Sequence, residues 1–549
     1  MQSNIYLAKS LYEINRIISL IDRSIASTTY GCFDRRYWSW RIGDIPNASL
    51  QYGILPLTLV RATKFEGNNY YQNKVIKEWI LAGLKYWIKI QNRNGSLNQF
   101  FPNEQSVGTT YYILSAVLQV YDLLENEIDD EIKEKIEIAV KKSAEFVLKY
   151  DETYAIISNH IALFAFVLYR LALRYNDTRY RVKADRYLNI ILKHQSAEGW
   201  YLEYNGADPG YQTQCIYYLA ECYRLTKNEE IVDSVKKSIE KFLVYFFHPD
   251  GSFGGEYGSR NTELIYPAGF EILKDKLESC SIISSFINQY LRKGTLISLD
   301  SMDDENLLRL TANYIITYNY SKSTDNSYEP ELNLPAYNDS LQVYFPEAGI
   351  LVKATDCYYM IIGASKGGVC KIFDKRNQKI IFDDPGYAFE CTDSIMITNQ
   401  FMQKPRLRIE NQSVTLEADF YTVLNSMLMP FTNVILRLLS LTFFRSIFFV
   451  DMFKKYLVKK AFTGSRKVYL SLKREIYFRN KEIIIEDTLN KDNTCIITKQ
   501  ISGRKLFSVK MASSSYVSVN DMVDCCGLTI NIEVLNRDNA IRVNRTIRI

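Results

Sequence analysis

Side chains that can bind a polar ligand and move protons recur at matching positions in the first half of the chain. They are Asn159 with His160, then Tyr211, then Asn261. Tyr211 lies 52 residues after Asn159, and Asn261 lies 50 residues after Tyr211. Equal spacing is typical of stacked structural units, in which equivalent positions lie on one rim. We therefore expect an amide, an imidazole and a phenol to meet at one cleft, at the starts of successive helices.

A short turn phrase marks the same unit. It reads Asn94-Gly95-Ser96-Leu97, then Glu198-Gly199-Trp200-Tyr201, then Asp250-Gly251-Ser252-Phe253. The three glycines stand 104 and then 52 residues apart. One unit of about 52 residues, a pair of helices, explains both intervals.

Helical hairpins are predicted over residues 1 to about 310. Apolar residues recur three or four apart, so each segment has a single buried stripe. Two clear examples are Ile132, Ile136, Ala139, Val140 and Val147, and Val232, Val235, Ile239, Phe242, Leu243 and Phe246.

Strands are predicted in the second half, where the apolar period becomes two. Val468, Leu470 and Leu472 alternate with polar residues, and Ile476 and Phe478 continue after a bulge-like break. A turn at Asn480-Lys481 leads into Ile483 and Ile485. The final strands are expected at Leu528, Ile530, Ile532 and Val534, and then at Ile541 and Val543.

The predicted fold class is α+β with several domains, because 549 residues exceed what one core supports. An N-terminal (α/α) incomplete toroid of helical hairpins is expected over residues 1–317. A polar, proline-bearing linker is expected over 318–335, and an antiparallel β-sandwich over 336–549.

These motifs together resemble the heparinase II/III-like polysaccharide lyases, a group that includes alginate lyases. Asn159-His160 opens one helix, and the segment from Asp208 to Gln214 opens the next. In the β half the resemblance rests on Ala348-Gly349-Ile350-Leu351, Lys366-Gly367-Gly368 and Asp384-Pro385-Gly386-Tyr387. It covers most of the chain.

The resemblance implies β-elimination at a uronic acid, with an acidic polysaccharide or oligosaccharide as the partner. A lyase must neutralise the sugar carboxylate, remove the α proton and protonate the leaving oxygen. Carried onto this chain, Asn159 would bind the carboxylate and His160 would act as base or charge stabiliser. Tyr211 would act as the acid and also as a base. The family usually adds a histidine from the β domain, but no histidine follows His248. Three alternatives remain: Tyr211 performs both proton transfers, a tyrosine such as Tyr387 substitutes, or the protein has lost the activity.

Further residues are predicted to bind substrate. One segment contains too many arginines and aromatic residues to be an ordinary loop. Its composition indicates a surface that binds a sugar or an anion, and not a solvated face. It supplies Arg35, Arg36, Tyr37, Trp38 and Trp40, while Gln212, Glu256, Arg260 and Asn261 come from the later loops. The catalytic candidates also have structural interpretations. Asn159 would cap its helix, and Tyr211 would pack in the core.

Composition excludes other classes of function. The 67 Lys and Arg residues against 62 Asp and Glu give a net charge of +5, so nucleic acid is not expected as a partner. With 3 His, no metal site is expected, and no cofactor is implied. Ten scattered Cys without a Cys-x-x-Cys pair indicate reduced thiols, and the N-terminus resembles a first helix rather than an export signal. A cytoplasmic protein is expected, acting in surface polysaccharide metabolism or assembly.

Residues 431–460 are the segment most similar to a membrane span. Arg437 and Arg445 interrupt it, and Lys454, Lys455, Lys459 and Lys460 follow. A helix packed between domains is one interpretation. Peripheral contact with an anionic membrane, by a helix lying in its plane, is the other.

Two rival functions remain open. A glycoside hydrolase would need two carboxylates across the cleft, drawn from Glu203, Asp208 and Glu256. A non-catalytic carbohydrate-binding assembly protein at the membrane face would use the same groove for recognition alone.

Overall fold

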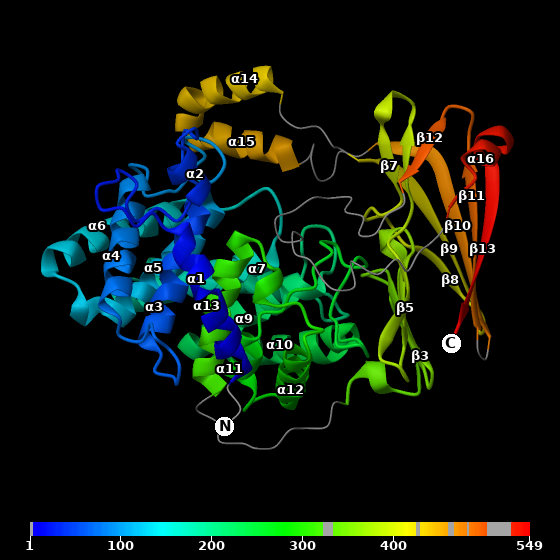
Figure 1. Cartoon of the computed structure of the whole chain (residues 1–549), viewed down its shortest axis with the longest axis horizontal. Coiled ribbons are helices and arrows are strands. Elements are labelled where there is room, and N and C mark those ends of the chain that lie inside the picture. Colours follow the sequence, from blue (N-terminus) through cyan, green and yellow to red (C-terminus); the bar gives the residue numbers. More distant parts are fainter. Residues whose placement is uncertain (1–3, 322–332, 424–428, 459–465, 480–481, 502–528) are drawn as a thin grey trace.

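The computed structural model describes residues 4–321, 333–423, 429–458, 466–479, 482–501 and 529–549. A helical part and a β part lie side by side (Figure 1). The predicted order, helical toroid first and antiparallel sheets second, is confirmed.

The helical part consists of hairpins whose first and last helices, α1 and α13, pack against each other. The helices are α1 (Ile5–Leu20), α2 (Arg35–Trp40), α3 (Ile54–Ala62), α4 (Lys74–Ile90), α5 (Val107–Leu124), α6 (Asp130–Lys149), α7 (Ser158–Tyr175), α8 (Thr178–Lys193), α9 (Pro209–Thr226), α10 (Glu229–Lys241), α11 (Ala268–Leu273), α12 (Glu278–Lys293) and α13 (Asp304–Ser321). The predicted stripes of α6 and α10 are buried, from Ile136 to Val147 and from Val232 to Ile239.

The three turn phrases share one conformation. Gly95, Gly199 and Gly251 have φ angles of 87°, 103° and 86°, a left-handed region open to glycine. In each turn the glycine N–H donates to the carbonyl three residues earlier. The midpoint between Gly95 and Gly199 falls inside α6, so the unit there lacks the turn and instead has the loop 150–157.

The β part has a small and a large antiparallel sheet in the described residues. The small sheet runs in the order β1 (Ser340–Phe345), β2 (Ile350–Thr355), β3 (Tyr358–Gly363), β4 (Val369–Asp374), β5 (Lys379–Asp384). The large sheet has the order β12 (Ile497–Ile501), β6 (Ala388–Cys391), β7 (Met396–Thr398), β9 (Ser413–Thr422), β10 (Lys467–Arg479), β11 (Glu482–Lys491), β13 (Ala540–Arg548), and β8 (Arg406–Ile409) pairs with β9.

The small sheet is covered on both faces. Tyr359 and Phe373 on one face join the helical core, where the Phe373 ring stacks on His248 at 4.5 Å. Met360 and Ile372 on the other face join the core shared with the large sheet. A sheet buried twice has continuous apolar strands, and every residue of β3 and β4 is buried. This sheet therefore fixes the helical part on the sandwich.

A buried ionic cluster crosses the sandwich. Arg474 has no exposed side-chain surface and donates to Asp487 at 2.7 Å and to Asp384 at 2.6 Å. Arg545 also pairs with both carboxylates, and Tyr387 donates to Asp487 at 2.5 Å. The bulge-like break expected before Ile476 is therefore wrong. The strand continues with a buried arginine at the inward position, and the register shift lies earlier, between Val468 and Ser471.

Two other predictions about the β half are wrong. Tyr387 cannot replace the missing histidine, because it is buried inside the sandwich on Asp487. Ile532 and Val534 are not in a strand: they lie in α16 (Ile532–Asp538), which Asn531 caps by accepting from the Val534 N–H. The predicted strand over Ile541 and Val543 is present as β13.

The predicted boundaries shift slightly. α13 continues to Ser321, four residues beyond the expected end of the helical domain. Most of the expected linker, the Asn480-Lys481 turn, Leu528, Lys459 and Lys460 lie outside the described residues.

The segment after β9 forms a helical hairpin of α14 (Pro430–Leu441) and α15 (Ile447–Val458). Although it belongs to the β half in sequence, it lies over the helical part (Figure 1). Asn103 donates to the Ser440 carbonyl, Gln105 donates to the Phe444 carbonyl, and Lys454 pairs with Glu104 at 2.9 Å. These contacts pack the hairpin against the helical part, and a position between the two domains stays a prediction.

We expect Arg474→Ala to lower the free energy of unfolding of the sandwich by about 3–5 kcal/mol, because it leaves two carboxylates buried with one cation fewer. The exposed Arg408, which pairs with Glu410 at 3.1 Å, provides the control Arg408→Ala, expected to change stability by less than about 1 kcal/mol. Chemical denaturation measures both. Equal losses in the two variants would contradict the role of the cluster.

Candidate functional site

Asn159 and His160 lie in the first turn of α7, and a backbone bridge joins that turn to the next unit. The Ser158 N–H donates to the Leu202 carbonyl, and the Tyr204 N–H donates to the Ile156 carbonyl. Ile157 and Glu203 form an isolated antiparallel bridge. This pairing brings the side chain of Glu203 beside Asn159.

The Asn159 amide is held at both ends. Its Nδ2 donates to Glu203 Oε2 at 2.9 Å, and its Oδ1 accepts from the Tyr112 hydroxyl at 3.3 Å. The Tyr112 hydroxyl in turn accepts from Gln214 Nε2 at 3.2 Å. Asn159 has no exposed surface. A sugar carboxylate reaches this amide only if neighbouring side chains move.

His160 pairs with Glu152, a residue of the loop 150–157. His160 Nδ1 lies 3.1 Å from Glu152 Oε2, and the imidazole is 24% exposed. Burial alone lowers the pKa of His160, but the Glu152 carboxylate outweighs it, so that pKa is raised. Burial raises the pKa of Glu152, and His160 more than offsets this, so that pKa is lowered. The pair therefore favours an imidazolium beside a carboxylate.

The Glu203 carboxyl has a pKa close to neutral pH. Burial raises its pKa to about 7, although Arg260, His160 and the Asn159 amide all act to lower it. A carboxyl that takes up a proton near pH 7 repels an approaching anion less than a fixed carboxylate does. This environment suits a site for an acidic sugar.

Tyr211 is the third residue of α9, which begins with Pro209. Asp208 caps the helix by accepting from the Tyr211 N–H at 3.1 Å, as the turn-like sequence predicts. The Tyr211 side chain is half-buried, and it lies close enough to Tyr112 to contribute to the raised pKa of that phenol, after burial and other neighbours. The Tyr112 ring also contacts His160 edge-on at 5.5 Å and its hydroxyl donates to Asn159, so Tyr112 joins Asn159 and His160. Tyr211 lies on the same helix, α9, as Gln214, whose side chain donates to the Tyr112 hydroxyl.

The third member of the predicted register differs. Asn261 is buried in the loop before α11, with φ 58°, and it does not begin a helix. The spacing of about one unit is correct for Asn159 and Tyr211. It fails at Asn261 because the residues after Phe253 run as a long loop against the sandwich instead of starting a helix.

Other predicted binding residues have mostly internal contacts. Gln212 donates to Ser238 and accepts from the Tyr201 N–H inside the toroid. Glu256 pairs with Lys371 of β4 at 2.9 Å, across the boundary between the domains. Both contacts favour structural roles.

Arg260 remains close to the candidate residues. Its guanidinium lies 3.4 Å from the centroid of the Tyr204 ring, and its charge lowers the pKa of Glu203. It is buried, so it forms part of the interior wall of the site and not of its rim.

The aromatic and arginine-rich segment forms α2 and its surroundings. Arg35, Arg36 and Trp40 are exposed, and the Trp38 indole donates to the Leu20 carbonyl. Tyr37 is half-buried. The following loop contacts α14 through an ion pair between Asp44 and Arg437 at 2.7 Å. Their described contacts do not reach Asn159 or His160, and their role in binding substrate stays a prediction.

Tyr112 and Glu152 were not predicted from the sequence, and Glu203 was predicted only as a carboxylate for hydrolysis. One signal for Glu152 was available, because its loop occupies the place where the repeated turn phrase is missing. Tyr112 lies within α5, and nothing in its local pattern separates it from an ordinary core tyrosine.

A cavity of about 300 Å³ adjoins the His160–Glu152 pair. Glu152 and Tyr154 line one side, and Phe448 and Lys454 of α15 line the other. A methyl group at Gly108, another lining residue, would lie 3.2 Å from Glu152 and 3.6 Å from His160. The inserted hairpin thus forms a wall of the space beside the imidazole.

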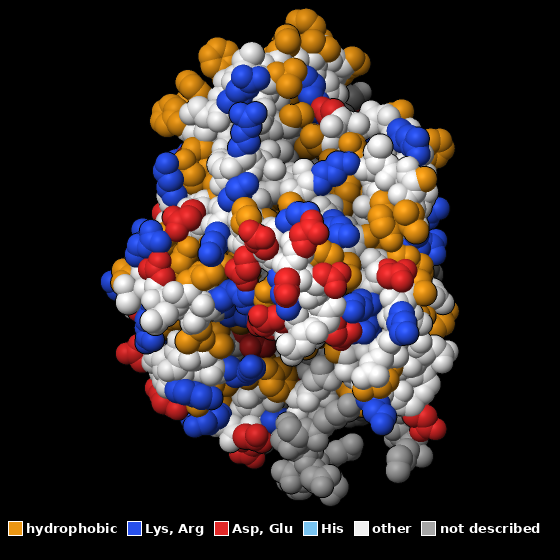
Figure 2. Space-filling view, turned by 90° about the vertical axis from the view of Figure 1, so that its left-hand side faces the viewer, with side chains coloured by type: hydrophobic (Ala, Val, Ile, Leu, Met, Phe, Trp, Pro, Cys, Tyr) orange, Lys and Arg blue, Asp and Glu red, His pale blue; other side chains and the backbone are white. Residues whose placement is uncertain are grey.

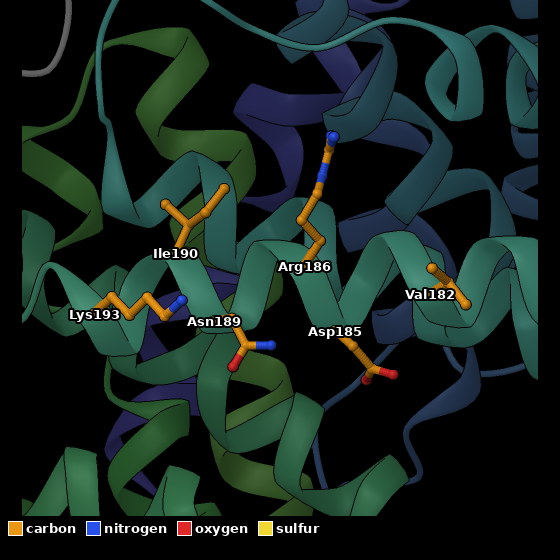
Figure 3. Close-up of a pocket in the computed structure, with 6 residues that line it drawn as sticks. All are labelled: Val182, Asp185, Arg186, Asn189, Ile190 and Lys193. Carbon is orange, nitrogen blue, oxygen red and sulfur yellow. The ribbon is translucent and has the colours of Figure 1, made fainter.

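A second depression, of about 430 Å³, lies on the outer face of α8 (Figure 3). All six lining residues come from this one helix, so polar groups from different elements do not converge there. Among the described residues, no group of three or more His, Cys, Asp or Glu side chains is placed to hold a metal ion.

Residues 54–267 match the family model of the ulvan lyase N-terminal domain. This range contains Asn159, His160, Tyr211 and Arg260. Among curated proteins, none matches the sequence.

The fold is similar to those of solved lyases. Chondroitin AC lyase of Streptomyces coelicolor A3, in complex with chondroitin sulphate, shares 10% identity at a TM-score of 0.54, over 89% of this chain and 67% of that chain. Heparinase III shares 11% identity at a TM-score of 0.49, over 90% and 72% of the two chains. The predicted resemblance to heparinase-like polysaccharide lyases is confirmed by the family match and by the shared fold.

We expect Glu152→Gln to lower the pKa of His160, because it removes the charge that raises it. With three histidines in the chain, His160→Ala identifies the resonance of His160 in an NMR titration. The wild-type imidazole should titrate above the ordinary value of 6.5 and the variant nearer to it or below. Glu134→Gln, at an exposed position of α6, is the control. An unchanged titration would contradict the pairing.

Proposed function

We propose that this protein is a polysaccharide lyase that cleaves a uronic-acid-containing polysaccharide by β-elimination. The carbon α to the sugar carboxylate loses a proton, a carbon–carbon double bond forms, and the glycosidic oxygen on the β carbon leaves and is protonated. The observation that carries the proposal is the contact of Tyr112 with both Asn159 and His160, with Tyr211 at the start of the helix whose Gln214 donates to Tyr112, within the region that matches the lyase family.

Asn159 is assigned to the sugar carboxylate. One amide hydrogen is donated to Glu203, which leaves the second for the substrate. The fixed amide acts as an oriented donor for the negative charge that develops on the carboxylate. Protonation of Glu203 on substrate binding would reduce the repulsion between the two acidic groups.

His160 is assigned to charge stabilisation and not to proton abstraction. Its raised pKa favours the imidazolium, which is a poor base but a good partner for the developing enediolate. Tyr211, in its phenolate form, then takes up the α proton and returns it to the leaving oxygen. With Tyr387 buried in the sandwich, the β domain supplies no tyrosine from that motif.

The geometry favours this function over hydrolysis. Asp208 caps α9 and also accepts from the Arg260 N–H at 2.8 Å, while Glu256 is paired with Lys371. Two of the three carboxylates considered for hydrolysis are thus engaged in structure, which leaves Glu203 without a second carboxylate from that set. A non-catalytic carbohydrate-binding protein would use the same residues without turnover, and the activity measurement below separates the two.

The site of action is proposed to be the cytoplasm, where the substrate is an acidic glycan of the cell's own surface polysaccharide. Peripheral contact with a membrane belongs to the same proposal. The thiols of Cys391 and Cys495 lie 3.7 Å apart in the sandwich. Whether they are free or joined in a disulfide therefore indicates whether the protein's compartment is reducing or oxidising.

We expect both thiols to be free in protein alkylated at the moment of lysis of its native cells, because a reducing compartment keeps such pairs open. Mass spectrometry of the alkylated peptides measures this. A native disulfide between Cys391 and Cys495 would place the protein in an oxidising compartment.

We expect Tyr211→Phe to retain the fold and to lose at least about a hundredfold of the activity, because it removes the proton-transfer group. The measurement is the absorbance of the unsaturated uronate over a panel of acidic polysaccharides. Tyr204→Phe is a nearby control. Retained activity in Tyr211→Phe would remove this phenol from the mechanism, and products without the double bond would indicate hydrolysis.

A further inference from the structure

The α14–α15 hairpin is apolar on more sides than the protein covers. On its inner side, Leu436 and Leu439 pack with Phe101, Phe444 and Val450 in a small core of their own. A helix that uses one stripe for packing normally presents polar residues on the other face. α14 does not.

The outer stripe of α14 is exposed and apolar. We call it the hairpin face, and it comprises Met429, Phe431, Val434, Ile435, Leu438, Leu441 and Phe443. These side chains are between 41% and 73% exposed. The four from Phe431 to Leu438 recur three and four residues apart, so they share one side of the helix. Figure 2 shows apolar side chains gathered over this end of the molecule, with Lys and Arg among them.

The hairpin is firmly attached to the toroid. Polar contacts from Asn103, Gln105 and Glu104 hold its inner side, and Thr153 donates to Asp451 at 2.8 Å. The outer face is therefore presented in a fixed orientation. Contiguous exposed apolar surface of this kind marks an interaction site.

Charge identifies the partner. Residues 429–457 contain Arg437, Arg445, Lys454 and Lys455 but a single acid, Asp451. Three of these cations are in ion pairs, Arg437 with Asp44, Lys454 with Glu104 and Lys455 with Asp451, so Arg445 and the neighbouring arginines supply most of the positive surface. The adjoining segment 35–42 adds three exposed arginines and no acid, and it also exposes Trp40 at 73% and Ile42 at 87%. Asp44, two residues after this segment, pairs with Arg437 and so joins it to α14. An apolar stripe among cations, with a tryptophan at its edge, is the composition of a surface that lies in an anionic lipid headgroup layer.

A spanning arrangement is not available to the described part of the chain, in which no helix is both long and apolar enough to cross a bilayer. We propose that the hairpin face docks in the plane of an anionic membrane surface, with Phe431 and Leu438 inserted among the lipids and Arg445 near the headgroups.

Docking has a consequence for the substrate, and this step rests on the proposed function. α15 forms one wall of the cavity beside Glu152, so a docked hairpin holds that cavity close to the lipid surface. A glycan held at the membrane is then the substrate best placed to reach His160.

Sedimentation of the full chain with vesicles tests the docking without any need for catalysis. We expect binding to vesicles rich in phosphatidylglycerol, loss of binding at high salt, and little binding to phosphatidylcholine alone. The double variant Phe431→Gln, Leu438→Gln should weaken binding at least about tenfold, because it removes the inserted side chains. Arg445→Ser should weaken it only on the anionic vesicles.

The double variant Leu173→Gln, Val182→Gln is the matched control, since these side chains are exposed at 64% and 68% on α7 and α8. It should bind vesicles like the wild type. Thermal melting confirms that each variant is folded.

Absence of binding to anionic vesicles, or equal binding by both double variants, would overturn the proposal. So would self-association in light scattering that Phe431→Gln, Leu438→Gln abolishes, because the face would then bind a second copy. If the wild-type protein binds vesicles but shows no lyase activity, the proposed function would be refuted and the proposed docking would stand.

Discussion

The pairing of residues 156–158 with residues 202–204 is the contact on which the site depends. It joins the start of α7 to the loop before α9 through backbone hydrogen bonds. These bonds bring the amide of Asn159 and the carboxyl of Glu203 within hydrogen-bond distance of each other. Asp208 then caps the next helix and places Tyr211. These contacts belong to the frame of the toroid, so the backbone fixes where these candidate residues lie.

Burial gives these groups their electrostatic character. Burial acts against the charged form of both Glu152 and His160, but each lies beside the other's opposite charge, so the pKa of Glu152 is lowered and that of His160 is raised. At Glu203 burial outweighs the nearby Arg260 and His160 charges, and the pKa of Glu203 rises to about 7. Three acidic or basic groups in one neighbourhood therefore have different charges near neutral pH, which is how a site can hold an anion and transfer protons at once.

Much of this arrangement could be predicted from the sequence. The turn glycines gave the unit length, and that length related Asn159 to Tyr211 correctly, because stacked hairpins of equal length repeat their geometry. It failed at Asn261, where the loop is shaped by contact with the sandwich and not by the repeat. The strand prediction failed at Arg474 for a related reason. An inward arginine interrupts the apolar alternation, and its partners Asp384 and Asp487 come from other strands, so the local sequence does not identify them. Glu152 was missed because its pairing with His160 depends on the bend of an irregular loop.

The α14–α15 hairpin shows why a fold alone does not define where a protein works. Its sequence lies between β9 and β10, yet its inner face packs against the toroid. Its outer face is exposed in the described part of the chain. Stability of the sandwich does not require such an insertion, since β9 and β10 pair directly along most of their length. Nor does packing on the toroid require phenylalanine and leucine on the far side of α14. An outer face of that composition persists only if something apolar meets it, and the surrounding arginines and lysines make a layer of anionic lipid headgroups over hydrocarbon the surface that satisfies both requirements.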